Sequence, residues 1–154
     1  MRPDRNDNLL AIAHVVSKRS TCSRLQVGAV FAREGRILVT GYNGAPTKQP
    51  HCNHECTCHS AGFEGYHLAG CNSLISCTQA EHAEKNAIAF AARYGVALDG
   101  STLYLTDSPC LSCAYSIVNA GVTEVWYDRE YRIMDGLYYL VSAGILIQRF
   151  ESNE

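Results

Sequence analysis

The feature that most constrains this chain is a pair of short motifs, His82-x-Glu84 and Cys110-x-x-Cys113. One imidazole and two thiolates are a ligand set that zinc takes in proteins, and a site with three protein ligands keeps its fourth position open for water. Zinc lowers the pKa of such a water to about 7, so hydroxide is available at neutral pH. Glu84 follows His82 closely enough to move protons to and from that water. The motifs therefore predict a catalytic zinc with His82, Cys110 and Cys113 as ligands and Glu84 as the catalytic residue.

The sequence around the two motifs supports this prediction. Residues 81–92 favour a helix that ends before Gly95, and the apolar run 102–106 predicts a strand. Pro109 then opens a second helix and places both cysteines on its first turn, where amide groups and the helix dipole favour thiolates. A Cys-x-x-Cys pair alone would also fit a redox pair or half of a structural zinc site. The conjunction of the two motifs favours the catalytic metal.

Length and composition describe a single globular domain, residues 1–154. Of the 154 residues, 47% are hydrophobic and 18% charged, which suffices for a full apolar core. The net charge of −2 argues against a nucleic-acid partner, and no apolar run reaches the roughly 20 residues of a membrane span. Because residues 1–8 lack the apolar core of a signal peptide, we expect a cytoplasmic protein. Eight cysteines in such a protein point to metal or catalysis before disulfides.

The remaining periodic segments predict an α/β fold in which strands alternate with helices. The resulting element order, α-β-β-α-β-α-β-α-β, implies a five-stranded sheet with helices on its faces. Gly136 weakens the last helix. The further elements are a helix from about 7 to 18 capped by Asp7, strands at 27–31 and 37–42 joined by a turn at 33–36, a strand at 122–127, a helix at 133–141 and a strand at 145–150.

Residues 47–79 depart from this pattern. A loop of this length is uncommon in a compact domain unless it is functional or cross-linked, and metal is the expected cross-link. Apolar periodicity is lost there, and the segment gathers His51, Cys52, His54, Cys56, Cys58, His59, His67, Cys71 and Cys77.

Four stretches together, 21–30, 41–46, 82–88 and 108–113, resemble the cytidine deaminase superfamily and, more narrowly, deoxycytidylate (dCMP) deaminases of bacterial and phage type. The His-x-Glu and Pro-Cys-x-x-Cys pattern is that of zinc deaminases, in which hydroxide attacks an amidine-like ring carbon. The resemblance implies a three-layer α/β/α fold with a five-stranded mixed sheet. The motif at 41–44 separates this group from nucleoside and tRNA deaminases.

The resemblance also implies an activity and its regulation. It implies a hydrolase acting on the C–N bond of a cyclic amidine, converting dCMP and water to dUMP and ammonia and supplying dUMP for thymidylate synthesis. It further implies a homohexamer, activated by dCTP and inhibited by dTTP, with Mg²⁺ accompanying the triphosphate. Phe90 and Arg93 match positions where the family packs subunits together, although ordinary helix burial and solvation would explain them too. Lys85 stands where Leu or Met is usual, and Glu81 stands where an apolar residue is usual.

Five residues match substrate positions of the family. Asn43 would contact the sugar, Arg24 would pair with the phosphate, and Tyr131 would lie near the substrate. Ala83 would offer its backbone amide to the pyrimidine carbonyl, and Ser108 would aim its carbonyl at the leaving amino group. Ordinary roles also remain open, because Asn43 suits a turn, Arg24 suits a solvated surface and Tyr131 suits core packing.

The turn at 41–44 is the candidate allosteric site. We expect it to leave a central strand, with glycines that let a triphosphate approach the backbone. Asn43 would then lie at the end that faces the catalytic helix and would belong to both sites. The predicted allosteric residues are Gly41, Tyr42, Asn43 and Gly44.

A second, structural zinc is implied by the same resemblance. A third zinc, drawing on Cys56, Cys58, His67 or Cys71, is conceivable from the ligand count, and free buried thiols are the alternative. The predicted ligands of the structural zinc are Cys22, Cys52 and Cys77, with Cys56, Cys58 or Cys71 as the fourth.

Three other functions compete with this prediction. The same zinc chemistry would serve another cytosine nucleotide, such as dCTP or a modified dCMP, with a different phosphate pocket. A zinc-binding module without catalysis is a second alternative, but a purely structural site gains nothing from Glu84. A nucleic-acid deaminase is the third, and the net charge disfavours it.

Overall fold

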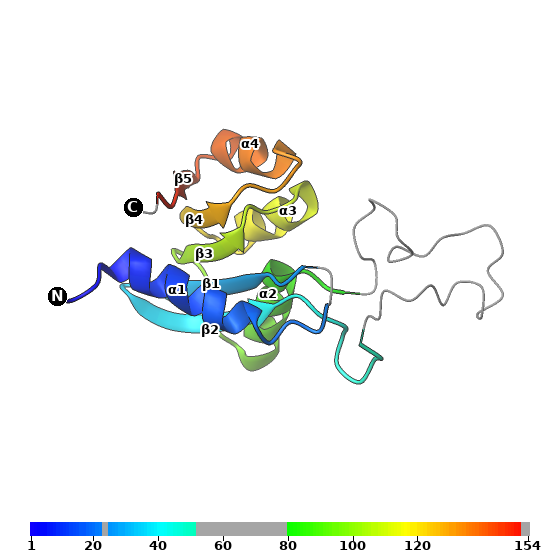
Figure 1. The fold of residues 1–154 in the computed structure, drawn as a ribbon. Coiled ribbons are helices and arrows are strands. Elements are labelled where there is room, and N and C mark those ends of the chain that lie inside the picture. The colour runs from blue at the N-terminus through cyan, green and yellow to red at the C-terminus, as the bar shows by residue number, and fades with distance from the viewer. Residues whose placement is uncertain (23–24, 52–79, 152–154) are drawn as a thin grey trace.

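The computed structural model describes residues 1–22, 25–51 and 80–151. Its strands form one sheet in the order β2-β1-β3-β4-β5 (Figure 1). Strand β1 is antiparallel to β2 and β3, whereas β4 and β5 continue parallel to β3. The elements are α1 (Arg5–Ser17), β1 (Gly28–Arg33), β2 (Arg36–Tyr42), α2 (Ala83–Tyr94), β3 (Thr102–Asp107), α3 (Leu111–Asn119), β4 (Glu124–Arg129), α4 (Asp135–Ser142) and β5 (Leu146–Arg149).

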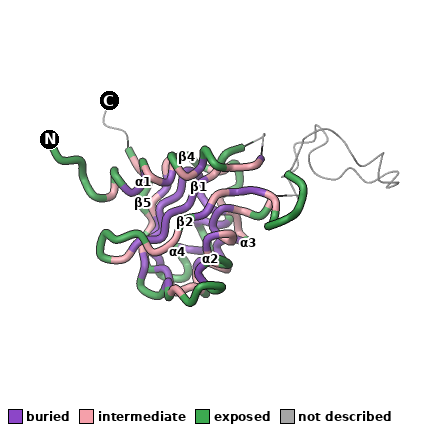
Figure 2. Tube along the Cα trace, turned by 90° about the horizontal axis from the view of Figure 1, so that it is seen from below, coloured by how far each residue is buried: buried purple, intermediate pink, exposed green. Residues whose placement is uncertain are grey.

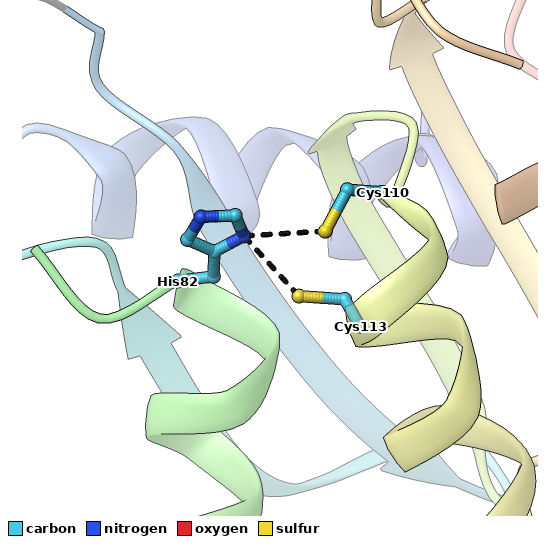
Figure 3. A group of neighbouring side chains, drawn as sticks. All are labelled: His82, Cys110 and Cys113. Carbon is cyan, nitrogen blue, oxygen red and sulfur yellow. Dashed lines mark hydrogen bonds between the residues drawn. The ribbon is translucent and has the colours of Figure 1, made fainter. Parts of the chain in front are cut away.

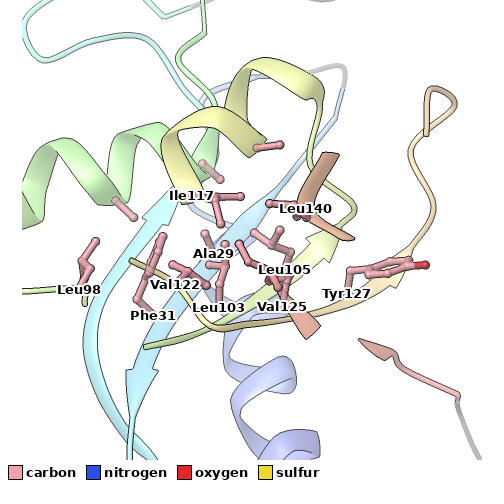
Figure 4. Close-up of a cluster of buried hydrophobic side chains, with 14 of the residues drawn as sticks. Ala29, Phe31, Leu98, Leu103, Leu105, Ile117, Val122, Val125, Tyr127 and Leu140 are labelled. Atoms are coloured by element: carbon pink, nitrogen blue, oxygen red, sulfur yellow. The ribbon is translucent and has the colours of Figure 1, made fainter. Parts of the chain in front are cut away.

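Helices cover both faces of the sheet. Helix α1 packs on one face through Leu9, Leu10 and Ala13, which contact Val30 and Tyr104. Helices α2, α3 and α4 pack on the other face, and the central strands β1 and β3 are buried between the layers (Figure 2). This is the predicted three-layer α/β/α architecture with a five-stranded mixed sheet. The larger core cluster includes Ala29, Phe31, Leu98, Leu103, Leu105, Ile117, Val122, Val125, Tyr127 and Leu140 (Figure 4).

The parallel pairing of β3 with β4 decides where polar residues meet. The register runs from Thr102 beside Glu124 to Asp107 beside Arg129. Both strands therefore end at the same edge of the sheet, the edge at which α/β folds commonly bind ligands. The turn that precedes α3 and the segment that follows β4 leave the sheet side by side at this edge.

Three local expectations were wrong. Asp4, rather than Asp7, caps α1, and its carboxylate accepts a hydrogen bond from the Asn6 amide at 2.8 Å. Pro109 precedes α3, because Cys110 has extended backbone angles and is itself the N-cap. Strand β2 is an edge strand, because β1 pairs with β3 along its other side, so the turn at 41–44 does not leave a central strand.

None of the helices within the described ranges is long and apolar enough to cross a membrane.

Candidate active site

Two helix N-termini bring the predicted zinc ligands together. His82 is the N-cap of α2, Cys110 is the N-cap of α3, and Cys113 lies in the first turn of α3. His82 Nδ1 is 3.5 Å from the Cys110 sulfur and 3.3 Å from the Cys113 sulfur (Figure 3). The three donor atoms lie within 4.8 Å of one another. Residues distant in sequence thus converge through helix termini, where backbone amides favour negative charge.

The donor geometry fits a zinc ion. Tetrahedral zinc with Zn–S of about 2.3 Å and Zn–N of about 2.05 Å holds a nitrogen and a sulfur about 3.6 Å apart. The two observed nitrogen–sulfur distances, 3.5 and 3.3 Å, are close to that value. Two thiols and one imidazole are also the donor set that zinc prefers. The observed residues therefore fit the metal that the sequence predicts.

Hydrogen bonds among the three donor groups shift their pKa values in a way that suits metal binding. Hydrogen bonding by the Cys113 thiol lowers the pKa of Cys110 to about 4, whereas the pKa of Cys113 is raised because that hydrogen bond holds its proton. The hydrogen bond with Cys110 raises the pKa of His82. Cys110 is therefore a thiolate at neutral pH, the form in which cysteine binds zinc.

Glu84 lies in the first turn of α2 and is only 4% exposed. Burial raises the pKa of this carboxyl group, because the charged form loses its water. A glutamate with a raised pKa is better matched to proton transfer near neutral pH than a solvated one. Its burial beside the donor atoms therefore suits the predicted catalytic role.

A cavity of about 220 Å³ opens beside these groups. Its wall includes His82, Glu84 and Cys110. The structure also brings four of the predicted substrate residues to this wall, whereas predicted residues Arg24, Cys52, Cys56, Cys58, Cys71 and Cys77 lie outside the described part of the chain. The four predicted residues on the wall are Asn43, Ala83, Ser108 and Tyr131.

Asn43 is a structural residue as well as a wall residue. Its Oδ1 accepts a hydrogen bond from the Val27 amide at 2.8 Å, and its Nδ2 donates to the Leu25 carbonyl at 2.7 Å. The Asn43 carbonyl accepts the Ser20 hydroxyl at 2.7 Å. The side chain therefore fixes the segment before β1 against the end of β2, and both segments contribute to the cavity.

Sequence reasoning missed two charged residues of the cavity wall, Asp107 and Arg132, and the ion pair between Asp107 and Arg129. Arg129 Nη2 is 3.0 Å from Asp107 Oδ2, and the Thr106 hydroxyl donates to the same oxygen at 2.6 Å. Ser108 completes the connection, since its amide donates to the Arg129 carbonyl and its Oγ accepts from the Tyr131 amide at 2.6 Å. The end of β4 thus fixes the turn that leads to Cys110. The sequence contains no signal for this ion pair, because the pair depends on the parallel register of β3 and β4.

The segment 41–44 is joined to the start of α2. Asn86 Nδ2 donates to the Tyr42 carbonyl at 2.8 Å. A Cβ atom on Gly41 would overlap the Ala83 carbonyl oxygen, so only glycine permits this approach of β2 to α2. Gly44 and Glu81 exchange two backbone hydrogen bonds, at 3.1 and 2.8 Å. Motion of this segment would therefore reach the turn that carries His82 and Glu84.

The two residues that depart from the family pattern each make a defined contact at the start of α2. Lys85 Nζ donates to the Ser112 hydroxyl at 2.6 Å and links α2 to α3 beside the donor atoms. Glu81 Oε1 accepts the His82 amide at 3.0 Å and satisfies a donor at the helix start. Phe90 and Arg93, the predicted interface residues, lie on the exposed side of α2, where Phe90 is 45% exposed.

A three-layer α/β/α sheet that carries a His/Cys/Cys donor set and a buried glutamate at its ligand-binding edge belongs to the class of zinc-dependent deaminases. The family model for the cytidine and deoxycytidylate deaminase zinc-binding region matches residues 3–128, and the chain belongs to this family.

Individual relatives agree with this assignment. The chain is 34% identical over 151 residues to ComE operon protein 2 of Bacillus subtilis (strain 168), covering 97% of this chain and 72% of that protein. It is 37% identical over 132 residues to the deoxycytidylate deaminase of Mycobacterium phage D29, covering 84% and 98% respectively. Among solved structures, the dCMP deaminase of cyanophage S-TIM5 in complex with dCMP and dUMP matches with a TM-score of 0.79 and 31% identity, over 97% of this chain and 99% of that one.

Proposed function

We propose that this protein catalyses the zinc-dependent hydrolysis of dCMP to dUMP and ammonia. One observation carries the proposal: His82, Cys110 and Glu84 line one cavity, with Cys113 completing the donor set. The similarity to the dCMP deaminase of cyanophage S-TIM5, which extends over 99% of that chain, supports dCMP as the substrate.

Each group has a defined task in this reaction. When bound by the three donors, a zinc ion supplies an activated water at neutral pH. Glu84 takes a proton from the attacking water and passes it to ring nitrogen N3. A new C4–O bond replaces the C4–N bond, and Glu84 delivers the second proton to the amino group, which leaves as ammonia. Burial of Glu84 among the donor residues keeps competing water away from this carboxyl group.

The other wall residues position the substrate in this proposal. The Ala83 amide binds the pyrimidine carbonyl, and the Ser108 carbonyl accepts from the amino group. Asn43 and Tyr131 border the sugar, while Arg24, outside the described residues, remains a proposed phosphate ligand. Support comes from the cavity, which Ala83, Asn43, Ser108 and Tyr131 all line.

A second zinc is proposed to hold the cysteine-rich insertion at 47–79. Cys22 would be one ligand, and it is buried with 3% exposure. Metal analysis of protein purified without chelator should give at least two zinc ions per chain, and one zinc per chain would contradict this proposal. The other proposed ligands, Cys52 and Cys77 with Cys56, Cys58 or Cys71, lie outside the described residues.

Regulation and assembly follow the family in this proposal. We infer a homohexamer that packs through Phe90 and Arg93, activation by dCTP with Mg²⁺, inhibition by dTTP, and supply of dUMP for thymidylate. The exposed side of α2, which carries Phe90, supports packing between subunits. The hydrogen bond between Asn86 and Tyr42 supports regulation by a triphosphate, because it connects the proposed effector turn to the catalytic helix.

Ammonia release tests the function directly. The panel contains dCMP, CMP, deoxycytidine, dCTP and single-stranded DNA, assayed with zinc-replete protein. We expect turnover on dCMP to exceed all others. Faster turnover of dCTP would support the alternative nucleotide, and zinc binding without any turnover would support a non-catalytic module. Either result would overturn the proposal.

A further inference from the structure

The formal charges of the carboxylates and guanidinium groups at the cavity cancel only when one residue behind its wall is counted. Within the described ranges, the side chains of these two kinds that line the cavity belong to Glu84, Asp107 and Arg132. Arg129 is not one of the described residues that line it, but its Nη2 lies 3.0 Å from Asp107 Oδ2. With Arg129 included, two formal negative charges meet two positive ones. The ion pair with Arg129 therefore decides whether the wall carries a net negative charge.

Asp107 is a buried carboxylate that a more exposed arginine holds in place. The residue is 8% exposed, whereas the Arg129 side chain is 52% exposed. Asp107 Oδ2 accepts hydrogen bonds from Arg129 Nη2 and, at 2.6 Å, from the Thr106 hydroxyl. Thr106 is itself fixed, because its hydroxyl oxygen accepts the Gly28 amide at 3.1 Å. The other oxygen, Oδ1, has no hydrogen-bond partner in the part of the chain that the structure describes. Arg129 thus neutralises this carboxylate and, together with Thr106, sets its position.

A buried carboxylate without its cation would oppose the binding of an anion. Removing one partner of a buried ion pair leaves an uncompensated charge, and salt screens such a charge less than it screens a charge in open solvent. A phosphate monoester carries about 1.5 to 2 negative charges at neutral pH. An unpaired Asp107 on the wall would therefore repel a nucleoside monophosphate from the cavity.

We propose that Arg129 is a positioning residue that holds and neutralises Asp107, so that the cavity accepts an anionic nucleotide. The proposal rests on the proposed deamination of dCMP, and it assigns no direct contact between Arg129 and the substrate. Because Arg129 acts through Asp107, the effect of losing Arg129 should disappear when Asp107 also loses its charge. That dependence distinguishes this role from one in which the pair only joins β3 to β4.

A double variant tests this dependence. Arg129→Gln should raise KM for dCMP about tenfold and change kcat less than about threefold, because the glutamine leaves Asp107 uncompensated. Adding Asp107→Asn should return KM to within about threefold of the wild-type value, since no charge then remains to be neutralised. Arg129→Lys should keep most of the wild-type affinity. The backbone hydrogen bond from the Ser108 amide to the carbonyl of residue 129 is retained in every variant.

The matched control is Arg149→Gln. It removes the same charge from an exposed pair with Glu130, whose side-chain oxygen lies 2.9 Å from Arg149 Nη1. Neither residue lines the cavity within the described ranges. The control should therefore leave KM for dCMP unchanged.

Product binding provides a readout that does not depend on catalysis. Calorimetry with dUMP should show the same loss in Arg129→Gln, the same recovery in the double variant, and a smaller loss as the ionic strength rises. A double variant that binds no better than Arg129→Gln, or an Arg129→Gln variant that binds dUMP as tightly as the wild type, would overturn the proposal. A zinc-replete wild type that deaminates no cytosine nucleotide would instead contradict the proposed function. Unfolding curves of each variant exclude loss of the fold as the cause.

Discussion

Gly136 packs against Pro109 so closely that a Cβ atom on the glycine would overlap the proline carbonyl oxygen. The same Cβ would lie 2.9 Å from the Cys110 carbonyl oxygen. The first turn of α4 therefore lies directly on the backbone that presents a proposed zinc ligand. In the sequence Gly136 only weakens a helix, by about 1 kcal/mol relative to alanine. In the fold it allows α4 to support the metal site.

This contact predicts that Gly136→Ala is harmful although alanine is the better helix former. Moving α4 or the Cys110 backbone should lower the free energy of unfolding by about 1–3 kcal/mol, as overpacking usually does. Zinc affinity should fall as well, because Cys110 must shift. Urea unfolding and competition with a chromophoric chelator measure the two effects. Val141→Ala, on the exposed side of the same helix, is the control and should change little. A more stable variant with unchanged zinc affinity would contradict the prediction.

The sequence predicted the layers and the core of the site because both depend on local patterns. Apolar periodicity marked each strand and helix to within a few residues. The fixed spacing of Cys110 and Cys113 on one helix start, and of His82 and Glu84 on another, needs no knowledge of tertiary structure. Only the convergence of these two helix starts was a tertiary expectation, and the structure brings the donor atoms within 4.8 Å of one another.

The rest depended on the order of strands, which local patterns do not contain. The pair Asp107 and Arg129 exists because β4 lies parallel to β3 in one particular register. The edge position of β2 follows from β1 pairing on both sides. Likewise, Lys85 and Ser112 are distant in sequence and meet only because α2 and α3 lie next to each other.

Glu84→Gln tests the proposed proton transfers. The amide keeps the size of the side chain but cannot carry protons, so turnover of dCMP should fall about 1,000-fold or more. Zinc content should stay unchanged, because Glu84 is not a proposed ligand. Glu81→Gln is a matched control, since its amide oxygen can still accept the His82 amide proton. Near-normal turnover of a zinc-replete Glu84→Gln variant would disprove the catalytic role.

Tyr104 should control part of the alkaline stability. It donates its hydroxyl proton to Asn6 Oδ1 at 2.8 Å, and burial raises the pKa of Tyr104 to about 12. Because the folded-state pKa exceeds the unfolded value of about 10, this stabilisation is present below about pH 10 and is lost as the pH rises toward 12. The free energy of unfolding should therefore fall more steeply in that window for the wild type than for Tyr104→Phe.

At about pH 8, where Tyr104 keeps its proton, the two proteins should differ in the free energy of unfolding itself. There the Tyr104→Phe variant should be less stable by about 1 kcal/mol, because the hydrogen bond to Asn6 is lost. Urea titrations of both proteins at about pH 8, 10 and 11.5 measure the difference. Parallel pH profiles of the two proteins would show that Tyr104 does not titrate as its burial requires.

Regulation should depend on the connection between Tyr42 and α2. We expect sigmoidal dCMP kinetics that dCTP with Mg²⁺ makes hyperbolic and dTTP suppresses, because an effector must prefer one of two states. Tyr42→Ala should weaken both effects more than basal turnover at saturating dCMP. Asn86→Ala, which removes only the 2.8 Å hydrogen bond to the Tyr42 carbonyl, should retain dCTP binding in calorimetry but lose much of the activation. Hyperbolic kinetics that neither triphosphate changes, in protein shown to be hexameric, would refute the regulatory proposal and leave the deaminase activity standing.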